Sequence, residues 1–150
     1  MSPHSTLFIA AGAALIVGCE TVERTATEAV GNNFSATLTG ANEVPPADPD
    51  GTGTAKISID DVTNRICTHL EVRDIGAVTA AHIHRGSAGV NGPPVVTLDA
   101  PDDDDSDDCD DVADELVDEI RRSPGTFYVN VHTADHPDGA IRGQVFNVQG

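Results

Sequence analysis

The sequence predicts an all-β fold, a two-sheet sandwich of about seven short strands with one amphipathic helix. From Phe34 onward, segments of alternating apolar and polar residues are separated by turn-forming glycine, proline, asparagine and aspartate, which is typical of short strands. Aromatic residues make up only 3%, so the core must be filled mostly by valine, isoleucine, leucine and alanine. A chain of 150 residues is long enough for one domain with a real core.

The first 32 residues are predicted to lie outside this domain. Residues 7–17 are an apolar run too short to span a bilayer but of the length of a signal-peptide core, so residues 1–18 are predicted to be a signal peptide. Ile16-Val17-Gly18-Cys19 resembles the lipobox of bacterial lipoproteins, which implies that Cys19 is acylated. The alternative is a free cysteine at the end of an ordinary helix. Residues 19–32 are then the lipidated cysteine and a polar, flexible tether.

Residues 33–150 are predicted to form the domain, with strands whose side chains alternate between two faces. In the third strand, for example, Ile66, Leu70 and Val72 share the inward face. The predicted strands cover residues 34–40, 54–59, 66–72, 78–84, 95–98, 127–132 and 140–148.

One strongly acidic segment interrupts this pattern, with thirteen acidic residues between Asp99 and Glu119. Within it Val112, Leu116 and Ile120 recur every four residues, which predicts an amphipathic helix over residues 111–122 that lies on the sandwich. The acidic run before this helix is interpreted as a solvated surface loop, with calcium chelation as the alternative.

The remaining cysteines, Cys67 and Cys109, are predicted to form a disulfide, because an even pair in an exported protein is most simply a bridge. A two-cysteine metal site is the alternative, but no CxxC spacing supports it. Cys67 alternates against the inward face of its strand, so the bridge is expected outside the core, on an outer face that the helix covers.

The formal charge of -17 excludes nucleic acid as a partner, since duplex binding needs cations that displace the counterions of the phosphates. Cations or a basic protein surface are the expected counterparts. The alternative is that the acidity only keeps the protein soluble.

Three histidines are the candidate site. His82 and His84 alternate with Ala81 and Ile83, so their imidazoles share one face of a strand, and His132 alternates with valines in a later strand. If these strands are neighbours, three imidazoles converge and can bind copper or zinc.

Two nearby residues, Asp135 and His136, are close enough in sequence to supply a fourth ligand or a second shell. The alternative is a structural network, in which the three histidines hydrogen-bond to the backbone and to Asn130 or Asn91 and fix the loop after the fourth strand. Arg142 and Glu43 are candidate ligand-binding residues, because a guanidinium attracts anions, but pairing of the two with each other is the stronger expectation.

Six blocks of sequence, taken in order, resemble the CHRD domain, a module of the extracellular protein chordin that is common in exported bacterial proteins. The resemblance covers residues 34–148 and implies an extracytoplasmic domain without a generally established activity. The blocks are Leu38-Thr-Gly-Ala-Asn-Glu-Val-Pro-Pro46, Gly51-Thr-Gly-Thr-Ala55, Val78-Thr-Ala-Ala-His-Ile-His-Arg-Gly86, Gly89-Val-Asn-Gly-Pro93, Tyr128-Val-Asn-Val-His-Thr133 and Pro137-Asp-Gly-Ala-Ile-Arg-Gly-Gln144.

A weaker likeness connects the chain with copper,zinc superoxide dismutase, and it implies a Greek-key, immunoglobulin-like sandwich. By this likeness His82, His84 and His132 stand at positions of copper ligands. Arg142 stands at the position of the arginine that guides the anion. The chain offers no bridging histidine and no counterparts of the zinc ligands, so the fold analogy does not carry the enzyme activity with it.

Two functions are therefore predicted. The first is a non-catalytic binding or structural module, lipid-anchored to the cell membrane or outer membrane through Cys19, with a protein, polysaccharide or cation partner. The second is a copper- or zinc-binding protein that uses the three histidines, in storage, sensing or redox defence. No nucleophile–base pair or matched carboxylates indicate an enzyme.

Overall fold

The computed structural model describes residues 32–148. The predicted signal peptide, Cys19 and the tether up to residue 31 lie outside the described residues. Among residues 32–148, no helix combines the length and the apolar character that crossing a membrane requires.

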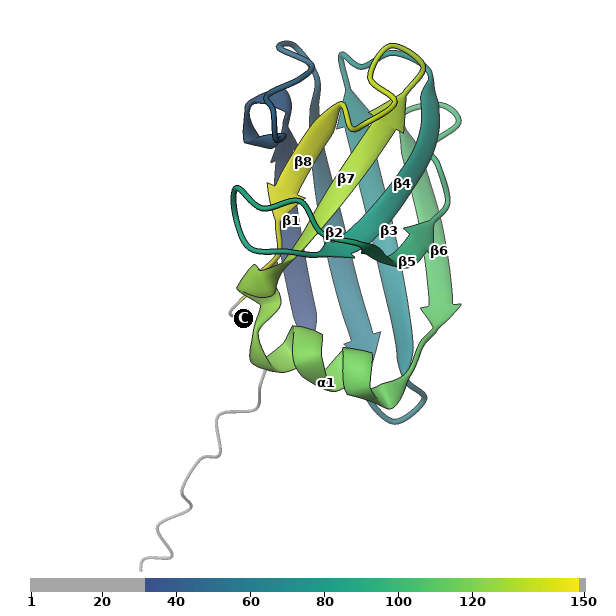
Figure 1. Cartoon of the computed structure of the whole chain (residues 1–150). Helices are drawn as coiled ribbons and strands as arrows, with labels where there is room; N and C mark the ends of the chain where they lie inside the picture. The colour runs from purple at the N-terminus through teal and green to yellow at the C-terminus, as the bar shows by residue number, and fades with distance from the viewer. Residues whose placement is uncertain (1–31, 149–150) are drawn as a thin grey trace, which may run out of the picture.

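Nine strands form one antiparallel sheet in the order β5-β4-β7-β8-β1-β2-β3-β6, with β9 paired to β1. The sheet folds over on itself into a nearly closed sandwich, with β4, β7 and β8 in one layer and β1, β2 and β3 in the other (Figure 1). The strands are β1 Asn33–Thr39, β2 Thr52–Asp60, β3 Arg65–Arg73, β4 Val78–Arg85, β5 Pro94–Leu98, β6 Asp105–Asp111, β7 Phe127–Thr133, β8 Ile141–Gln144 and β9 Phe146–Asn147. The helical elements are α1 Asp114–Arg122 and the 3-10 turns η1 Gly40–Asn42 and η2 Pro124–Thr126.

The predicted all-β sandwich is confirmed, and the core lies between its layers as the alternation requires. β1 turns Phe34, Ala36 and Leu38 inward, and β4 turns Ala81 and Ile83 inward, all of them buried. The layers are not separate sheets, because Thr39 at the end of β1 pairs with Arg142 of β8.

The last predicted strand, residues 140–148, is two strands in the structure. β8 pairs with β7 up to Gln144, and after Val145 the chain changes partner so that β9 pairs with β1. Gly143 permits this crossing, since a Cβ at that position would lie 2.3 Å from the carbonyl oxygen of Thr37 in β1. The change of partner joins the two layers along this side.

The acidic run before the helix was predicted as a loop, and this is wrong from Asp105 onward. β6 is an edge strand that pairs with β3 from Arg65↔Asp111 to Glu71↔Asp105. Its side chains alternate between exposed and half-buried, with none in the core, so the strand carries no apolar period to reveal it. Charged side chains are suited to an edge strand because they discourage pairing with other chains.

The predicted disulfide between Cys67 and Cys109 is confirmed, with an S–S distance of 2.04 Å and a Cα–Cα distance of 4.0 Å. The predicted position of the helix over this bond was wrong. The cysteines meet because they face each other across β3 and β6, not because a helix covers the outer face.

Helix α1 runs across one end of the sandwich, and its Val117 and Ile120 belong to the core (Figure 1). It begins at Asp114, three residues later than predicted, because residues up to Asp111 belong to β6.

A candidate metal centre of three histidines

The three candidate histidines lie on two neighbouring strands, as the sequence pattern required. Ala81 and Ile83 of β4 are buried in the core, which turns His82 and His84 to the outer face of the same layer. In β7 the same alternation turns His132 to this outer face. The antiparallel register places His84 opposite Tyr128 and Ala80 opposite His132.

The imidazoles converge. One nitrogen from each of the three rings lies within 4.8 Å of the others, and His82 Nδ1 is 3.2 Å from His132 Nε2. The His82 ring centroid is 5.4 Å from that of His84 and 5.1 Å from that of His132. Zinc–nitrogen bonds of about 2.0–2.1 Å place two ligands of a tetrahedral site roughly 3.4 Å apart, so the His82–His132 pair already has this spacing.

Two backbone carbonyls orient the rings. His84 Nδ1 donates to the carbonyl oxygen of Gly92 at 2.8 Å, and His132 Nδ1 donates to that of Pro137 at 2.9 Å. Because a carbonyl only accepts, both Nδ1 atoms carry the proton and both Nε2 atoms carry a lone pair. Metal-ligating histidines commonly donate their other ring nitrogen in this way. His84 Nε2 is buried and has no hydrogen-bond partner in the part of the chain that the structure describes.

The surroundings favour neutral rings. The pKa of His82 is lowered, first by burial and then by repulsion from the charged forms of His132 and His84. The pKa of His84 is also lowered by burial, partly offset by its hydrogen bond to Gly92. Neutral imidazole is the form that binds metal ions.

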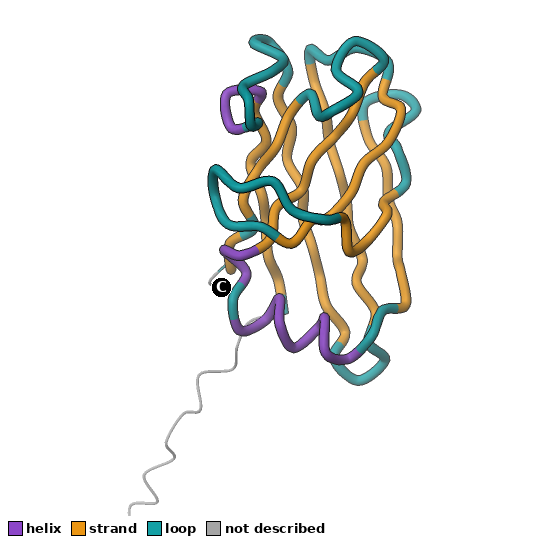
Figure 2. Tube along the Cα trace, in the orientation of Figure 1, coloured by secondary structure: helices purple, strands orange, loops and turns teal. Residues whose placement is uncertain are grey.

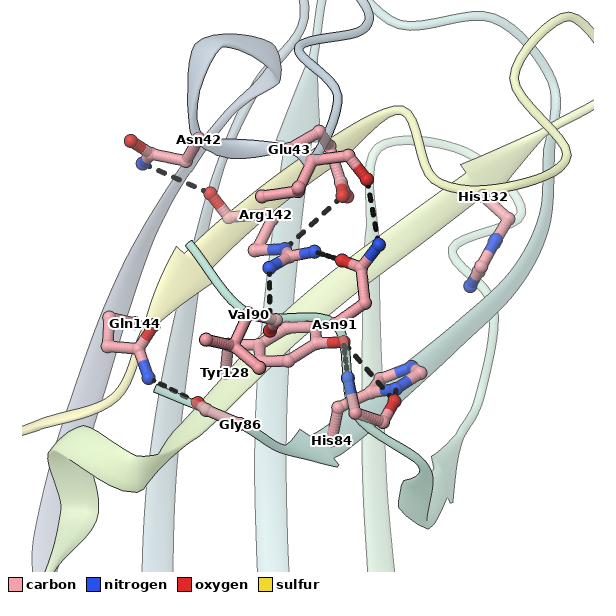
Figure 3. Close-up of polar contacts among 12 residues, drawn as sticks. Asn42, Glu43, His84, Gly86, Val90, Asn91, Tyr128, His132, Arg142 and Gln144 are labelled. Carbon is pink, nitrogen blue, oxygen red and sulfur yellow. Dashed lines mark hydrogen bonds and ion pairs between the residues drawn. The ribbon is translucent and has the colours of Figure 1, made fainter. Parts of the chain in front are cut away.

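The β4–β5 loop (residues 86–93) covers this face of the sheet (Figure 2). Arg142 of β8 attaches the loop to the sheet. Its guanidinium donates hydrogen bonds to the carbonyl oxygen of Val90 at 3.3 Å and to Asn91 Oδ1. Asn91 in turn donates to the carbonyl oxygen of Val44 at 2.8 Å. The loop that supplies the Gly92 acceptor is thus fixed against the sheet and the turn after η1 (Figure 3).

Arg142 and Glu43 form the expected ion pair, with Arg142 Nε 3.2 Å from Glu43 Oε2 and side-chain exposures of 3% and 4%. Burial raises the pKa of Glu43, and the charge of Arg142 opposes this shift. The Arg142 guanidinium carbon also lies 4.0 Å from the centroid of the Tyr128 ring, which stacks on His84 at 4.8 Å (Figure 3). Through these contacts the Glu43–Arg142 pair supports the three-histidine cluster. A direct role of the pair in binding a ligand stays a prediction.

The sequence-predicted fourth ligands are not brought into the cluster. Within residues 32–148, the metal-compatible group around His82 contains neither Asp135 nor His136. The backbone N–H of His136 donates to Thr133 Oγ1 at 3.1 Å, which stabilises the turn after β7. Asn91 holds Arg142 and the Val44 turn, and it has no hydrogen bond to any histidine within residues 32–148.

Tyr128 was missed, although alternation along β7 places it on the same face as His132. Hydrogen bonds from the histidines to the backbone were predicted in the structural network, but the accepting carbonyls of Gly92 and Pro137 were not identified, because a backbone carbonyl leaves no sequence signal.

A second group of possible ligands lies on the outer face of β3 and β6 and consists of His69, Asp105 and Asp107. It differs from the first because both nitrogens of His69 already contact carboxylates, Asp107 at 2.9 Å and Glu71 at 3.1 Å. These bonds raise the pKa of His69, the one to Glu71 contributing most, and both ring nitrogens already have carboxylate partners.

Comparison with known proteins gives one match. The family model described as CHRD domain matches residues 34–145, which includes all three histidines and the disulfide. No curated protein and no solved structure matched the chain.

Proposed function

The chain belongs to the CHRD domain family, and from this membership and the three-histidine geometry we propose that it is a binding domain whose ligand is a copper or zinc ion. The observation that carries the proposal is the buried lone pair of His84 Nε2, which finds no partner among residues 32–148 although Gly92 fixes the opposite nitrogen of the ring. Leaving a buried acceptor unpaired costs about 1–3 kcal/mol. A metal ion at the cluster satisfies it.

The alternative of a purely structural histidine network explains less. Such a network accounts for the His82–His132 contact and for the two carbonyl bonds. The network's predicted partner Asn130 raises the pKa of His84, but within residues 32–148 it is not placed at hydrogen-bond geometry to His84 Nε2. Imidazole ligands suit copper and zinc, and among divalent first-row ions copper binds a given nitrogen site most tightly.

The test is metal analysis of the full chain, purified in detergent without a histidine tag and titrated with Cu(II) and Zn(II). We expect one equivalent of tightly bound metal, which His82→Ala and His84→Ala each abolish. His136→Ala is the matched control, since this histidine lies outside the cluster, and it should keep the full equivalent. Circular dichroism checks that the variants are folded. A wild type that binds no metal, or His82→Ala that binds like wild type, overturns the proposal.

We also propose that the domain is exported and held at a membrane by lipid on Cys19. The support is the apolar run of residues 7–17, the Gly18-Cys19 junction after it, and the Cys67–Cys109 disulfide, since such bonds persist in oxidising compartments. A metal-binding domain in this position meets ions outside the cytoplasm, which fits storage, sensing or redox defence at the cell surface.

A further inference from the structure

Asn130 lies on the same face of β7 as His132, two residues before it in the strand. The register places it opposite His82 of β4 on one side and opposite Arg142 of β8 on the other. Its side chain is almost wholly buried, with a residue exposure of 3%. The amide of Asn130 therefore lies among the candidate ligands, on the face of the sheet that the β4–β5 loop covers.

The amide oxygen of Asn130 is an acceptor without a donor. Oδ1 is buried, and no described residue donates a hydrogen bond to it. The Asn130 amide interacts with His84 closely enough to raise the pKa of that ring, but among residues 32–148 neither Asn130 Oδ1 nor the neutral ring's Nε2 has a partner with hydrogen-bond geometry. Two buried acceptors, a ring nitrogen and an amide oxygen, thus lie close together with no proton between them.

Such an arrangement is costly unless the ligand satisfies both acceptors. The ring nitrogen needs a metal ion or a proton donor, and the amide oxygen needs a hydrogen-bond donor. An unpaired buried acceptor costs about 1–3 kcal/mol, whereas an apolar side chain of similar shape avoids this cost. A metal ion fills the need of the imidazole lone pair but not that of the amide oxygen, which is too weak a ligand to compete with water unless it is fixed at bonding distance. A water bound to that metal supplies the missing donor.

The ligand count agrees. Among residues 32–148 the cluster offers three protein ligands, and three-ligand zinc sites typically keep a fourth position for water, whereas structural sites are closed by four protein ligands.

We infer that Asn130 holds a solvent ligand of the metal, by accepting a hydrogen bond from water or hydroxide in the fourth coordination position. This inference rests on the proposed metal site. It makes the site an open one, in which a small oxygen- or nitrogen-donor molecule can replace the water, rather than a closed structural site.

The test compares the Cu(II)-loaded full chain with two variants at this position. Asn130→Leu keeps the approximate shape and removes the acceptor. Asn130→Asp is nearly isosteric and introduces a carboxylate that can bind the metal itself. Asn42→Leu is the control, because Asn42 is an exposed asparagine whose amide instead donates to the carbonyl oxygen of Arg142 at 3.2 Å. Water-proton relaxation measures the exchanging water on copper, and titration with azide measures replacement of that water.

We expect the wild type and Asn42→Leu to relax water protons and to bind azide. Asn130→Leu should bind copper about tenfold more weakly, with an altered water signal, as is typical when an outer-shell partner is removed. Asn130→Asp should bind copper more tightly, lose the water signal and no longer bind azide.

The outcomes separate the two proposals. If the wild type binds copper and both Asn130 variants match it in affinity, relaxation and azide binding, the role of Asn130 is overturned while the metal site stands. If the wild type binds copper but relaxes no water protons, the open position is overturned. If the wild type binds no metal, both proposals fail together.

Discussion

At the scale of single residues, the ion pair of Glu43 and Arg142 decides whether the covered face can form. Both groups are charged and almost wholly removed from water, so their mutual attraction and the surrounding hydrogen bonds must offset a desolvation cost of several kcal/mol per ion. Removing one partner leaves the other charge buried and unpaired, which is worse than the pair itself.

We therefore expect Glu43→Gln to lower the free energy of unfolding by about 3–5 kcal/mol. The control is Arg65→Gln, which breaks the exposed Arg65–Asp111 pair and should change the free energy of unfolding far less, because water screens that pair. Denaturant unfolding of both variants measures the difference. Similar losses in the two would mean that the buried pair does not stabilise this face.

Gly139 belongs to the same support. Its φ is +130°, a conformation that side chains rarely adopt, and a Cβ there would lie 2.6 Å from Glu43 Oε1. Gly139→Ala should therefore destabilise the fold by roughly 1–3 kcal/mol. Gly125→Ala is the matched control, because no atom lies within 4 Å of the Cβ it would add. Thermal unfolding compares the two, and an unchanged midpoint for Gly139→Ala would contradict the close approach seen here.

Much of the candidate site could be predicted residue by residue. Period-two alternation is a local property, so the faces of His82, His84 and His132 followed directly from the sequence. The convergence required β4 and β7 to be neighbours, which alternation does not determine. The turn-forming loop over the site and its carbonyl acceptor at Gly92 required the folded chain, since any residue has a carbonyl to offer.

At the scale of elements, β6 is attached to β3 by a column of side-chain pairs on one face. Arg65 and Asp111 form an ion pair at 2.8 Å, Cys67 and Cys109 are bonded, and His69 contacts Asp107 at 2.9 Å. Glu71 and Asp105 end the column as like charges directly opposite each other, which is unfavourable. A strand so acidic is held by specific pairs, not by a buried apolar face, and for this reason hydrophobic patterning did not identify it.

Reduction of the disulfide should release β6 before the rest of the sheet. The bond closes a loop with a sequence separation of 42, and in the chain-entropy account this stabilises the fold by about 4 kcal/mol. Amide hydrogen exchange after reduction should show loss of protection in β6, with β1 and β7 still protected. The helix should stay protected longer than β6, because Val117 and Ile120 are buried in the core. A Cys67→Ser/Cys109→Ser double variant should not respond to reductant, and uniform loss of protection across the sheet in the wild type would contradict this order.

The same column predicts a pH dependence. His69 faces Glu71 on its own strand, Asp107 and Asp105 on β6 and Lys56 on β2. Its pKa is raised from 6.5, chiefly by the hydrogen bond to Glu71 and then by that to Asp107. A raised folded-state pKa means that the stabilisation is fully present below the unfolded value of 6.5 and is lost as pH rises through the folded value.

The measurement is the unfolding free energy of the wild type minus that of His69→Gln across this range. The difference should be largest below pH 6.5 and should fall as the pH rises through the folded-state pKa, above which the imidazole is neutral in both states. A difference that stays constant with pH would show that the ring acts only through packing.

At the scale of the whole molecule, the fold has two kinds of interior. Apolar side chains fill the space between the layers, while the outer face of β4, β7 and β8 carries a polar set covered by the β4–β5 loop. The sequence predicted the first kind well, because its residues are hydrophobic and periodic. Closure of the sheet through β1 and β8, and the position of α1 across one end, depend on long-range pairing that no local pattern determines.

The attachment of this domain to a membrane is predicted to depend on Cys19. The buried apolar side chains of residues 32–148 run from Phe34 to Val145 and form one core cluster, so we expect the fold to tolerate a change at Cys19. An acyl chain contributes about 0.8 kcal/mol of membrane affinity per buried methylene, and two or three chains are enough for stable anchoring. Cys19→Ser should therefore move the protein from the membrane to the soluble fraction and abolish labelling by a fatty acid. Its thermal unfolding and its Cys67–Cys109 bond should be unchanged.

Cys67→Ser is the control, because it should lose the disulfide and some stability but stay labelled and membrane-bound. A Cys19→Ser protein that is still labelled, or that remains in the membrane fraction, would show that the anchor lies elsewhere.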